Sequence, residues 1–444
     1  MRWKTLDLQG WGRTSSGACQ AARPERVAEA VAALADADDT GILAHGAGTS
    51  YGDVAINPGG RVLLTRRLNR LLAFDPATGE VVAEAGVTIR DLLRVFLPRG
   101  FLIPVSPGTA FVTLGGAVAN DVHGKNHEGA GSFCTHVRWL DLLLPSGEIV
   151  RTGPDQRPEL FQATAGGVGL TGVILAVCLR LKPVSSNGVV VTERRIPDMD
   201  GFLAALEQVE VGAYSVGWID ALSGGGALGR GVLQVGRPAT GPVPVPPRRD
   251  RSLPVDLPGF VLNPLTVAAF NALYWRRVPA AGRERVLAYE TFSYPLDAIL
   301  QWNRLYGAAG FHQFQCVVPA AGGPAALRRL LEETSRARAA SFLAVLKRLG
   351  DGRAGFLSFP RAGYTLAMDF PHRAGTLALL ARLERVVREH GGRVYLAKDS
   401  ALSPEGFAEM YPEADRFRAV LAEVDPAGRM TSALARRLKL RRAA

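Results

Sequence analysis

The sequence predicts an α+β fold built from three stretches of chain. Residues 1–185 alternate short apolar strands with helices. Residues 186–392 contain strands of antiparallel character and two long helices, and residues 393–444 return to a strand followed by helices. A change of character of this kind after Pro183 is typical of a chain with more than one domain. The length of 444 residues suits two or three domains.

The first stretch holds two predicted helices and five predicted strands. A helix over 24–35 has Pro24 near its first turn and apolar residues along one face. A helix over 88–97 is amphipathic, and Pro98 and Gly100 end it. The predicted strands are 41–45, 61–65, 81–85, 139–144 and 173–181.

The later stretches hold longer elements. The predicted strands are 188–192, 214–219 and 313–318, and the predicted helices are 324–338 and 376–390. The second helix ends at Gly391 and Gly392, which is a common helix stop. The Pro- and Arg-rich segment 238–258 predicts a surface loop. A strand over 393–397 and helices beyond it complete the prediction.

Charge and composition narrow the function classes. The formal net charge is +11, and only six of the 52 basic residues are lysines. A basic surface favours anionic substrates, nucleic acid or lipid headgroups. No nucleic-acid-binding motif is present, so nucleic acid is not an expected partner. The densest basic cluster, 436–442, is either a solvated tail or a contact with a membrane surface.

Cysteine usage and hydropathy indicate the compartment. Four widely spaced cysteines with no C-x-x-C pair favour a reducing cytoplasm. The N-terminus has no apolar export signal, and no run of about 18 apolar residues occurs. We therefore expect a cytoplasmic protein, soluble or peripheral at the inner membrane face.

Three glycine-rich turns occur in the first stretch, at 45–53, 107–127 and 165–172. Glycine lets backbone N–H groups approach a ligand closely, and successive N–H groups form an anion nest. One such turn could be purely structural, but together they predict a large phosphate-bearing ligand such as the dinucleotide FAD. The Rossmann and Walker A motifs are absent.

The two histidines of His123-Gly-Lys-Asn-His127 could suggest a metal site. They are four residues apart and would share a face if helical, but Gly124 and Asn126 disfavour a helix. No carboxylate-rich helix accompanies them, so no metal is expected, and a polar turn beside the flavin is the better interpretation.

Lys398 is the leading candidate for an active ionisable group. It follows an apolar strand in a chain where arginine dominates, and a buried lysine can release its proton near neutral pH whereas arginine cannot. A surface lysine paired with Asp399 is the competing explanation. The same argument applies more weakly to Lys125 and Lys347.

Aromatic and amide side chains alternate in the middle stretch. Rings can cover the apolar face of a sugar while amides bind its hydroxyls, although such residues can equally form core. The set comprises Trp218, Tyr294, Trp302, Tyr306, Phe311, Gln313 and Gln315.

Nine motifs, in order, carry a family resemblance. They are Gly10–Thr14, Ser50–Asp53, Pro107–Thr109, Asp121–His127, Gly131–Phe133, Gly169–Gly172, Trp302–Gly307, Ala397–Ser400 and Met410–Pro412. Together they resemble the decaprenylphosphoryl-β-D-ribose 2′-oxidase family, the flavin subunits of a ribose-to-arabinose epimerase, within the vanillyl-alcohol oxidase type of FAD flavoproteins. The resemblance covers nearly the whole chain.

This resemblance implies a PCMH-type FAD-binding domain in two parts, 1–185 and 393–444, around a substrate domain, 186–392, built on an antiparallel sheet flanked by helices. Many members attach flavin through a histidine where this chain has Thr49, so non-covalent FAD is implied. The residues implied to bind FAD are His45, Gly46, Ala47, Gly48, Thr49, Ser50, Tyr51, Pro107, Gly108, Thr109, Gly115, Gly116, Asn120, His123, Gly124, Lys125, Gly169, Thr171, Gly172 and Val173. Those implied to bind substrate are His123, Lys125, Trp218, Gln313, Gln315, Lys347, Thr365 and Lys398.

The implied reaction oxidises a secondary hydroxyl of a furanose sugar, the 2′-OH of a polyprenylphosphoryl ribose or a similar compound, to a ketone by hydride transfer to flavin N5. The base would be Lys398, assisted by Tyr51 or Tyr395. A separate ketoreductase could then reduce the ketone from the other face, which completes an epimerisation in arabinan biosynthesis.

The chain departs from the family pattern in the sugar pocket. Ala367 replaces a cysteine, Thr365 replaces an asparagine, and Ser293 stands where an aromatic residue is expected. These changes leave a second substrate open, a different pentoside, nucleoside or glycoside of a specialised-metabolite pathway. A catalytically silent flavin-fold partner protein is a further alternative, which the presence of Lys398, Tyr51 and Lys125 disfavours.

Overall fold

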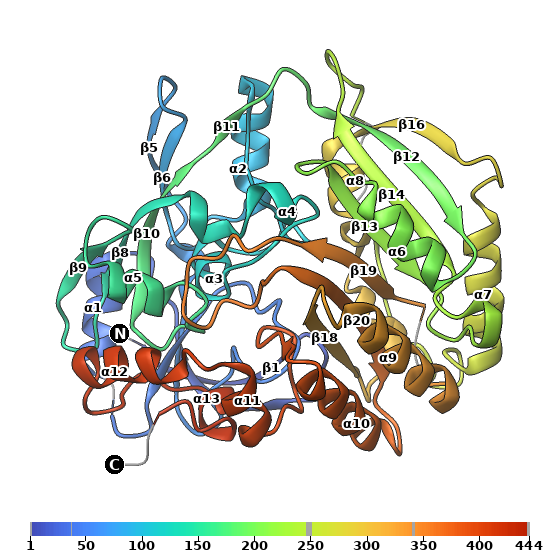
Figure 1. Ribbon diagram of the computed structural model, residues 1–444. Coiled ribbons are helices and arrows are strands. Elements are labelled where there is room, and N and C mark those ends of the chain that lie inside the picture. Colours follow the sequence, from blue (N-terminus) through green and yellow to red (C-terminus); the bar gives the residue numbers. More distant parts are fainter. Residues whose placement is uncertain (1, 37, 246–250, 340–341, 442–444) are drawn as a thin grey trace.

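The computed structural model describes residues 2–36, 38–245, 251–339 and 342–441. The predicted α+β fold is confirmed, because the strands gather into three main sheets and helices cover them (Figure 1). The N-terminal sheets, blue to green in Figure 1, lie on one side of the molecule. A large sheet with green, yellow and orange strands lies on the other.

Two sheets form the N-terminal part. In the first, β2 and β3 both pair with β4 in parallel, while β1 pairs with β2 antiparallel. The second is antiparallel throughout. In spatial order the strands are β1 (Lys4–Gln9), β2 (Ser16–Ala22), β4 (Arg61–Leu64) and β3 (Ile42–His45), then β5 (Leu71–Asp75), β6 (Glu80–Glu84), β10 (Val173–Arg180), β8 (Val137–Leu143) and β9 (Ile149–Thr152).

An eight-stranded sheet forms the rest, and the antiparallel character predicted for the middle stretch is confirmed. In spatial order its strands are β16 (Arg283–Ala288), β12 (Gly188–Ile196), β14 (Gly231–Pro238), β13 (Tyr214–Ile219), β19 (Ala344–Leu349), β20 (Gly363–Pro371), β18 (Phe311–Pro319) and β21 (Arg393–Val394). Two strand pairs stand apart, β7 (Phe101–Leu102) with β11 (Lys182–Pro183), and β15 (Arg251–Ser252) with β17 (Ile299–Leu300).

The four helices predicted over 24–35, 88–97, 324–338 and 376–390 start and stop within a few residues of the predicted positions. Thr88 caps the second of them, because its hydroxyl accepts the N–H of Asp91 at 3.1 Å. The helices are α1 (Val27–Ala35), α2 (Ile89–Phe96), α3 (Leu114–Ala119), α4 (His127–Ala130), α5 (Pro158–Thr164), α6 (Met199–Glu207), α7 (Pro264–Arg276), α8 (Tyr289–Ser293), α9 (Gly323–Ala337), α10 (Thr376–Glu389), α11 (Pro404–Met410), α12 (Ala414–Val424) and α13 (Ala433–Arg437).

The strand predicted over 393–397 is wrong beyond residue 394. Only β21 is extended, and it pairs with β18 at the edge of the large sheet. The chain then turns, because the N–H of Lys398 donates to the carbonyl of Tyr395 at 3.0 Å. The apolar run that suggested a longer strand is instead buried inside this turn.

The C-terminal segment returns to the first sheet. The N–H of Ile42 donates to the carbonyl of Arg429 at 2.8 Å, and Met430 forms a parallel bridge with Ile42. Of the predicted loop 238–258, residues 246–250 lie outside the described residues, and the remainder contains only the short strand β15 and the end of β14. The division of the chain into domains stays a prediction.

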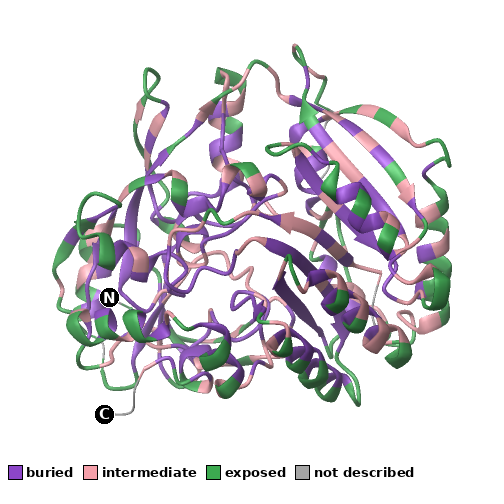
Figure 2. Cartoon of the chain, viewed as in Figure 1, coloured by how far each residue is buried: buried purple, intermediate pink, exposed green. Residues whose placement is uncertain are grey.

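Burial follows the sheets. The strands at the centre of Figure 2 are buried along most of their length, while the outer faces of the helices are exposed. In β18 and β20 nearly every residue is buried, on both faces of the sheet. One face packs on α9 and α10, and the other contributes polar side chains to the cavity described next.

Candidate active site

A cavity of about 860 Å³ is lined both by the glycine-rich turns and by the strands β13, β18, β19 and β20 of the large sheet. Ligand pockets in proteins span about 300–1,000 Å³, so this one suits a large ligand. Residues that lie hundreds of positions apart in the sequence therefore share one site.

The three glycine-rich turns bring most of the predicted FAD-binding residues to this cavity. The lining includes Gly46, Ala47, Gly48, Thr49, Ser50, Tyr51, Pro107, Gly108, Thr109, Gly115, Gly116, Asn120, His123, Gly124, Lys125, Gly169 and Gly172. His45, Thr171 and Val173 are not in the lining. The Nδ1 atom of His45 lies 2.7 Å from the carbonyl oxygen of Ala55, and the hydroxyls of Thr171 and Thr164 are 2.9 Å apart.

The chemistry of this lining fits a dinucleotide. A Cβ on Gly108 would meet no protein atom within 4 Å, so its backbone is open to a ligand. Among the described residues, Asn120 Oδ1 and His123 Nδ1 are buried without a hydrogen-bond partner. Such atoms are costly to leave unsatisfied, which indicates that a polar ligand completes the site.

A close backbone contact brings Tyr51 and Lys398 together. The N–H of Tyr51 donates to the carbonyl of Ala397 at 3.1 Å. Residue 52 must be glycine, because a Cβ there would lie 1.8 Å from the carbonyl oxygen of Asp399. The Nζ atom of Lys398 then lies 3.7 Å from the centre of the Tyr51 ring, within the range of a cation–π contact.

Three of the six lysines line the cavity, namely Lys125, Lys347 and Lys398. Burial lowers the pKa of Lys125 to about 7, of Lys347 to about 8 and of Lys398 to about 7. The charge of Lys347 lowers the pKa of each of the other two further. The surface pairing of Lys398 with Asp399 is therefore wrong, because the Asp399 carboxylate bonds Arg437 instead.

Amide side chains on β18 form hydrogen bonds with a histidine and a carboxylate. Gln315 Nε2 donates to His123 Nε2 at 3.0 Å and to the Thr365 hydroxyl at 3.2 Å. Gln313 Nε2 donates to Asp369 at 2.6 Å. Thr365 is buried behind Gln315 and is not part of the cavity lining.

Asp369 is a site residue that sequence reasoning missed. Burial raises the pKa of this carboxyl to about 7, although Gln313, Tyr306 and Lys398 oppose the rise. An acidic residue in the otherwise apolar strand β20 was the available signal. Asp297 was also missed, and its carboxylate accepts the N–H of Ala110 at 2.8 Å beside the cavity.

The two candidate tyrosines, Tyr51 and Tyr395, have pKa values shifted in the same direction but contact different groups. Burial raises the pKa of both Tyr51 and Tyr395 well above the usual value, so both are neutral near pH 7. The hydroxyl of Tyr395 donates to the carbonyl of Asn120 at 3.0 Å. Tyr395 therefore ties the segment after β21 to the glycine-rich helix α3.

The aromatic residues divide between cavity and core. Trp218 and Trp302 line the cavity, and Trp218 Nε1 donates to the carbonyl of Phe342 at 2.8 Å. Tyr306 and Phe311 stack with their ring centres 4.0 Å apart and form core behind Tyr51. Tyr294 is fully buried, and its hydroxyl bonds Ser106.

His123 and His127 form hydrogen bonds with different partners. Their ring centres are 6.3 Å apart, and the Nδ1 atom of His127 accepts the N–H of Gly350 at 3.2 Å. Within the described part of the chain, no group of three or more metal-ligating side chains occurs. No described helix has the length and apolar character needed to cross a membrane.

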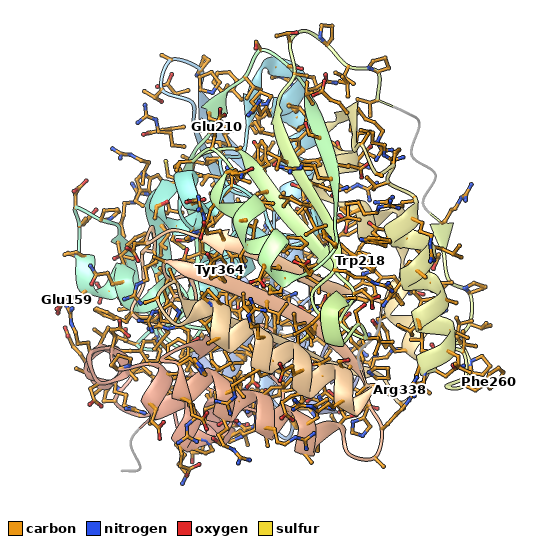
Figure 3. The ribbon with its side chains drawn as sticks, turned by 45° about the vertical axis from the view of Figure 1, so that its right-hand side comes forward. Glu159, Glu210, Trp218, Phe260, Arg338 and Tyr364 are labelled. Carbon is orange, nitrogen blue, oxygen red and sulfur yellow. The ribbon has the colours of Figure 1, made fainter. Side chains whose placement is uncertain are left out.

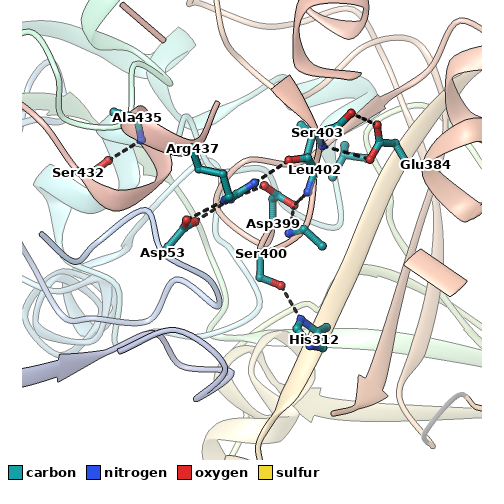
Figure 4. A network of polar contacts seen from close by, with 12 residues as sticks. Asp53, His312, Glu384, Asp399, Ser400, Leu402, Ser403, Ser432, Ala435 and Arg437 are labelled. Carbon is teal, nitrogen blue, oxygen red and sulfur yellow. Dashed lines mark hydrogen bonds and ion pairs between the residues drawn. The ribbon is translucent and has the colours of Figure 1, made fainter. Parts of the chain in front are cut away.

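The C-terminal arginines form hydrogen bonds and ion pairs with side chains of earlier segments, and Figure 4 shows those of Arg437 with Asp53 and Asp399. Arg437 donates to both carboxylate oxygens of Asp53 at 2.7–2.8 Å and to Asp399 at 2.8 Å. Arg436 donates to Asn57 at 2.7 Å, and Arg441 contacts Asp425. These three arginines bond protein side chains, so neither a solvated tail nor a membrane contact describes them. Of the other basic residues in the predicted cluster, Lys439 is exposed and residue 442 lies outside the described residues.

Two family models match the chain. The model of an FAD binding domain matches residues 18–153, and that of D-arabinono-1,4-lactone oxidase matches residues 302–438. The first includes two of the glycine-rich turns and the second includes Gln313, Gln315, Lys347 and Lys398. The chain therefore binds FAD and is an FAD-dependent oxidoreductase.

Individual proteins are similar over different lengths. Decaprenylphosphoryl-β-D-ribose oxidase of Mycolicibacterium smegmatis is 37% identical over 98% of both chains. An uncharacterised protein of Streptomyces coelicolor is 36% identical over 80% of this chain and its own full length. L-gulonolactone oxidase of Bos taurus is 31% identical over 41% of each chain.

Proposed function

This chain belongs to the decaprenylphosphoryl-β-D-ribose oxidase family, and from that membership we propose that it oxidises the 2′-hydroxyl of a polyprenylphosphoryl ribose to a ketone. FAD, when bound, supplies the acceptor for the hydride that leaves the carbinol carbon. The substrate and the residue roles that follow are our proposal.

Lys398 is the proposed base. Its amine lines the cavity, and a pKa lowered by burial to about 7 leaves a substantial neutral fraction at neutral pH. The neutral amine accepts the hydroxyl proton of the sugar as the C–H bond gives up its electron pair. Tyr51, whose ring lies against the Lys398 amine, orients that amine.

The other cavity residues bind and orient the sugar. Trp218 offers an aromatic face, Gln313 and Gln315 offer amide oxygens as acceptors, and Lys347 offers an amine from the strand on the other side of β20. His123 Nε2 accepts from Gln315, so its Nδ1 atom carries the proton, and this donor has no acceptor within the described protein. This donor suits the cofactor or the substrate.

The observation that carries the proposal is that three half-buried lysines line one cavity together with the glycine-rich turns. The test is anaerobic reduction of the bound flavin by polyprenylphosphoryl ribose, followed by absorbance. Lys398→Met should keep the FAD spectrum and lose at least about a hundredfold in reduction rate, the usual scale for a general base. Lys4→Met, which removes an exposed lysine on β1, is the matched control.

A second substrate class is favoured by one observation. Ser293 and Ala367, which depart from the family pattern, both line the cavity. Smaller side chains there leave more room beside the sugar, which suits a pentoside or nucleoside. Bleaching of the flavin by a water-soluble nucleoside, but not by the lipid-linked sugar, would replace the first substrate with the second.

The remaining roles follow from the proposed product. A 2-keto sugar is an intermediate that a separate ketoreductase can reduce from the opposite face, which inverts the carbinol centre. An epimerisation of this kind would serve arabinan synthesis in the cytoplasm, at the inner membrane face. The test adds a reductase and its cofactor to the reaction. If the inverted sugar forms only then, the result supports this order of the two reactions.

A further inference from the structure

Helix α7 (Pro264–Arg276) lies at the outer edge of the large-sheet side of the molecule (Figure 1). One face of α7 is directed inward. Val267 and Asn271 are buried, and Phe270 and Tyr274 line the cavity. Asn271 donates to Asp220 at 2.7 Å, which fixes the helix to the protein. Helix α7 is therefore a wall of the cavity.

The opposite face of α7 is apolar and uncovered. Leu265 and Leu273 are 76% and 71% exposed, and Ala269 between them is also exposed. Because these residues are spaced by four, they form one stripe on the helix. Phe260, in the loop before α7, is 76% exposed and projects at the outer corner in Figure 3.

Three of the most exposed large apolar side chains lie in α7 or in the loop before it. Among the described residues, thirteen large hydrophobic side chains are exposed, and Phe260, Leu265 and Leu273 are each more than 70% exposed. Exposed apolar residues that gather in one patch mark a contact with another apolar partner. We refer below to the surface formed by Phe260, Leu265, Ala269 and Leu273 as the α7 surface.

Positive charge borders the α7 surface. Arg276 and Arg277 end the helix and are exposed. Arg277, Arg283 and Arg285 all contact the single buried carboxylate of Glu193, so three cations share one anion. This excess favours a partner with negative charge beside an apolar layer.

We propose that the α7 surface docks the protein on an anionic lipid bilayer, with the apolar stripe in the acyl boundary and the arginines at the headgroups. A second copy of this chain fits less well, because it would cover the apolar stripe but offer no apolar stripe rimmed by anionic groups for the arginines. Charge complementarity thus selects the bilayer.

The role of the docking surface rests on the proposed function, because docking serves an enzyme whose substrate is lipid-linked. The polyprenyl chain of the substrate stays in the bilayer while its sugar must reach the cavity. Since α7 has the cavity on one side and the apolar stripe on the other, docking places the cavity beside the lipid.

The test is co-flotation of the purified FAD-loaded protein with vesicles, measured without substrate. Vesicles of phosphatidylcholine mixed with phosphatidylglycerol should carry the protein, and vesicles of phosphatidylcholine alone should carry roughly tenfold less. The double variant L265E/L273E should lose roughly tenfold or more of the binding to the mixed vesicles. L377E, which changes a leucine 52% exposed on α10, is the matched control and should bind like the wild type.

The vesicle experiment tests the docking surface, and the flavin-reduction experiment tests the proposed substrate. Equal flotation of L265E/L273E and the wild type overturns the docking surface, as does a wild type that ignores mixed vesicles. A wild-type dimer in sedimentation that the double variant abolishes also overturns it, in favour of a second copy. Flavin reduction by soluble sugars is measured separately, so a wrong substrate would fail there and leave the vesicle result standing.

Discussion

Arg437 donates a hydrogen bond of 2.8 Å to the carboxylate of Asp399, the residue that follows Lys398. The same guanidinium bonds Asp53, which ends the first glycine-rich turn. One side chain on α13 thus holds together the two segments whose approach places Lys398 over Tyr51. Arg437, Asp53 and Asp399 all lie outside the cavity lining.

Arg437→Gln should destabilise the protein and slow flavin reduction. The change leaves Asp53 and Asp399 without their cation, which costs about 1–3 kcal/mol of stability. Thermal denaturation and anaerobic reduction rates measure the two effects. Arg329→Gln, which removes an exposed ion pair with Glu389, should change neither, since surface pairs contribute about 0–1 kcal/mol. A wild-type reduction rate in Arg437→Gln would contradict the positioning role.

The rate of flavin reduction should depend on pH. Burial lowers the pKa of Lys398 to about 7, and only the neutral amine can accept a proton. The rate should therefore rise as the pH increases through about 7 and level off above it. Lys347→Met removes a charge that lowers this pKa, so the midpoint should move to higher pH. Stopped-flow reduction across pH measures the midpoint, and a downward move would sink the assignment.

A single added carbon at Gly108 should weaken FAD binding without harming the fold. The new Cβ of Gly108→Ala meets no protein atom, yet the residue lines the cavity. Affinity for FAD should fall by roughly tenfold or more, as expected for one misplaced carbon in a fitted pocket. Gly226→Ala also adds a Cβ in open space, but away from the cavity, and serves as the control. Fluorescence titration of the apoprotein with FAD compares them.

Ala367→Cys should create a reactive thiol in a chain whose own thiols are inert. The four native cysteines are buried, and burial raises the pKa of Cys178 to about 11 and of Cys316 to about 12. Ala367 lines the cavity and is partly accessible. Iodoacetamide should label the native variant once and the native wild type not at all, as read by mass spectrometry. Labelling of the native wild type would show that a buried cysteine is accessible after all.

The sequence predicted the parts of the site that local chemistry determines. The glycine-rich turns could be found because backbone approach to a ligand requires glycine, and Lys398 because lysine is rare in this chain. Asp369 could not be found this way, since its role depends on the register that pairs it with Gln313. The strand after Arg393 was predicted too long, because the apolar run that suggested it is buried by a turn.

Contacts between residues far apart in the sequence explain why the roles of the C-terminal arginines were not predicted. The arginines near the C-terminus suggested a tail or a membrane contact because their partners lie far away in the sequence. Arg437 and Asp53 are separated by 384 positions, and no local pattern announces such a pair. Their contact depends on the C-terminal segment reaching the first sheet at Ile42.

The bond between Arg437 and Asp53 also links the first glycine-rich turn to a residue that is translated much later. The two residues are 384 positions apart in the sequence. During synthesis this turn is therefore made before its guanidinium partner exists. We expect a chain that stops before residue 437 to retain FAD less firmly than a chain that includes it.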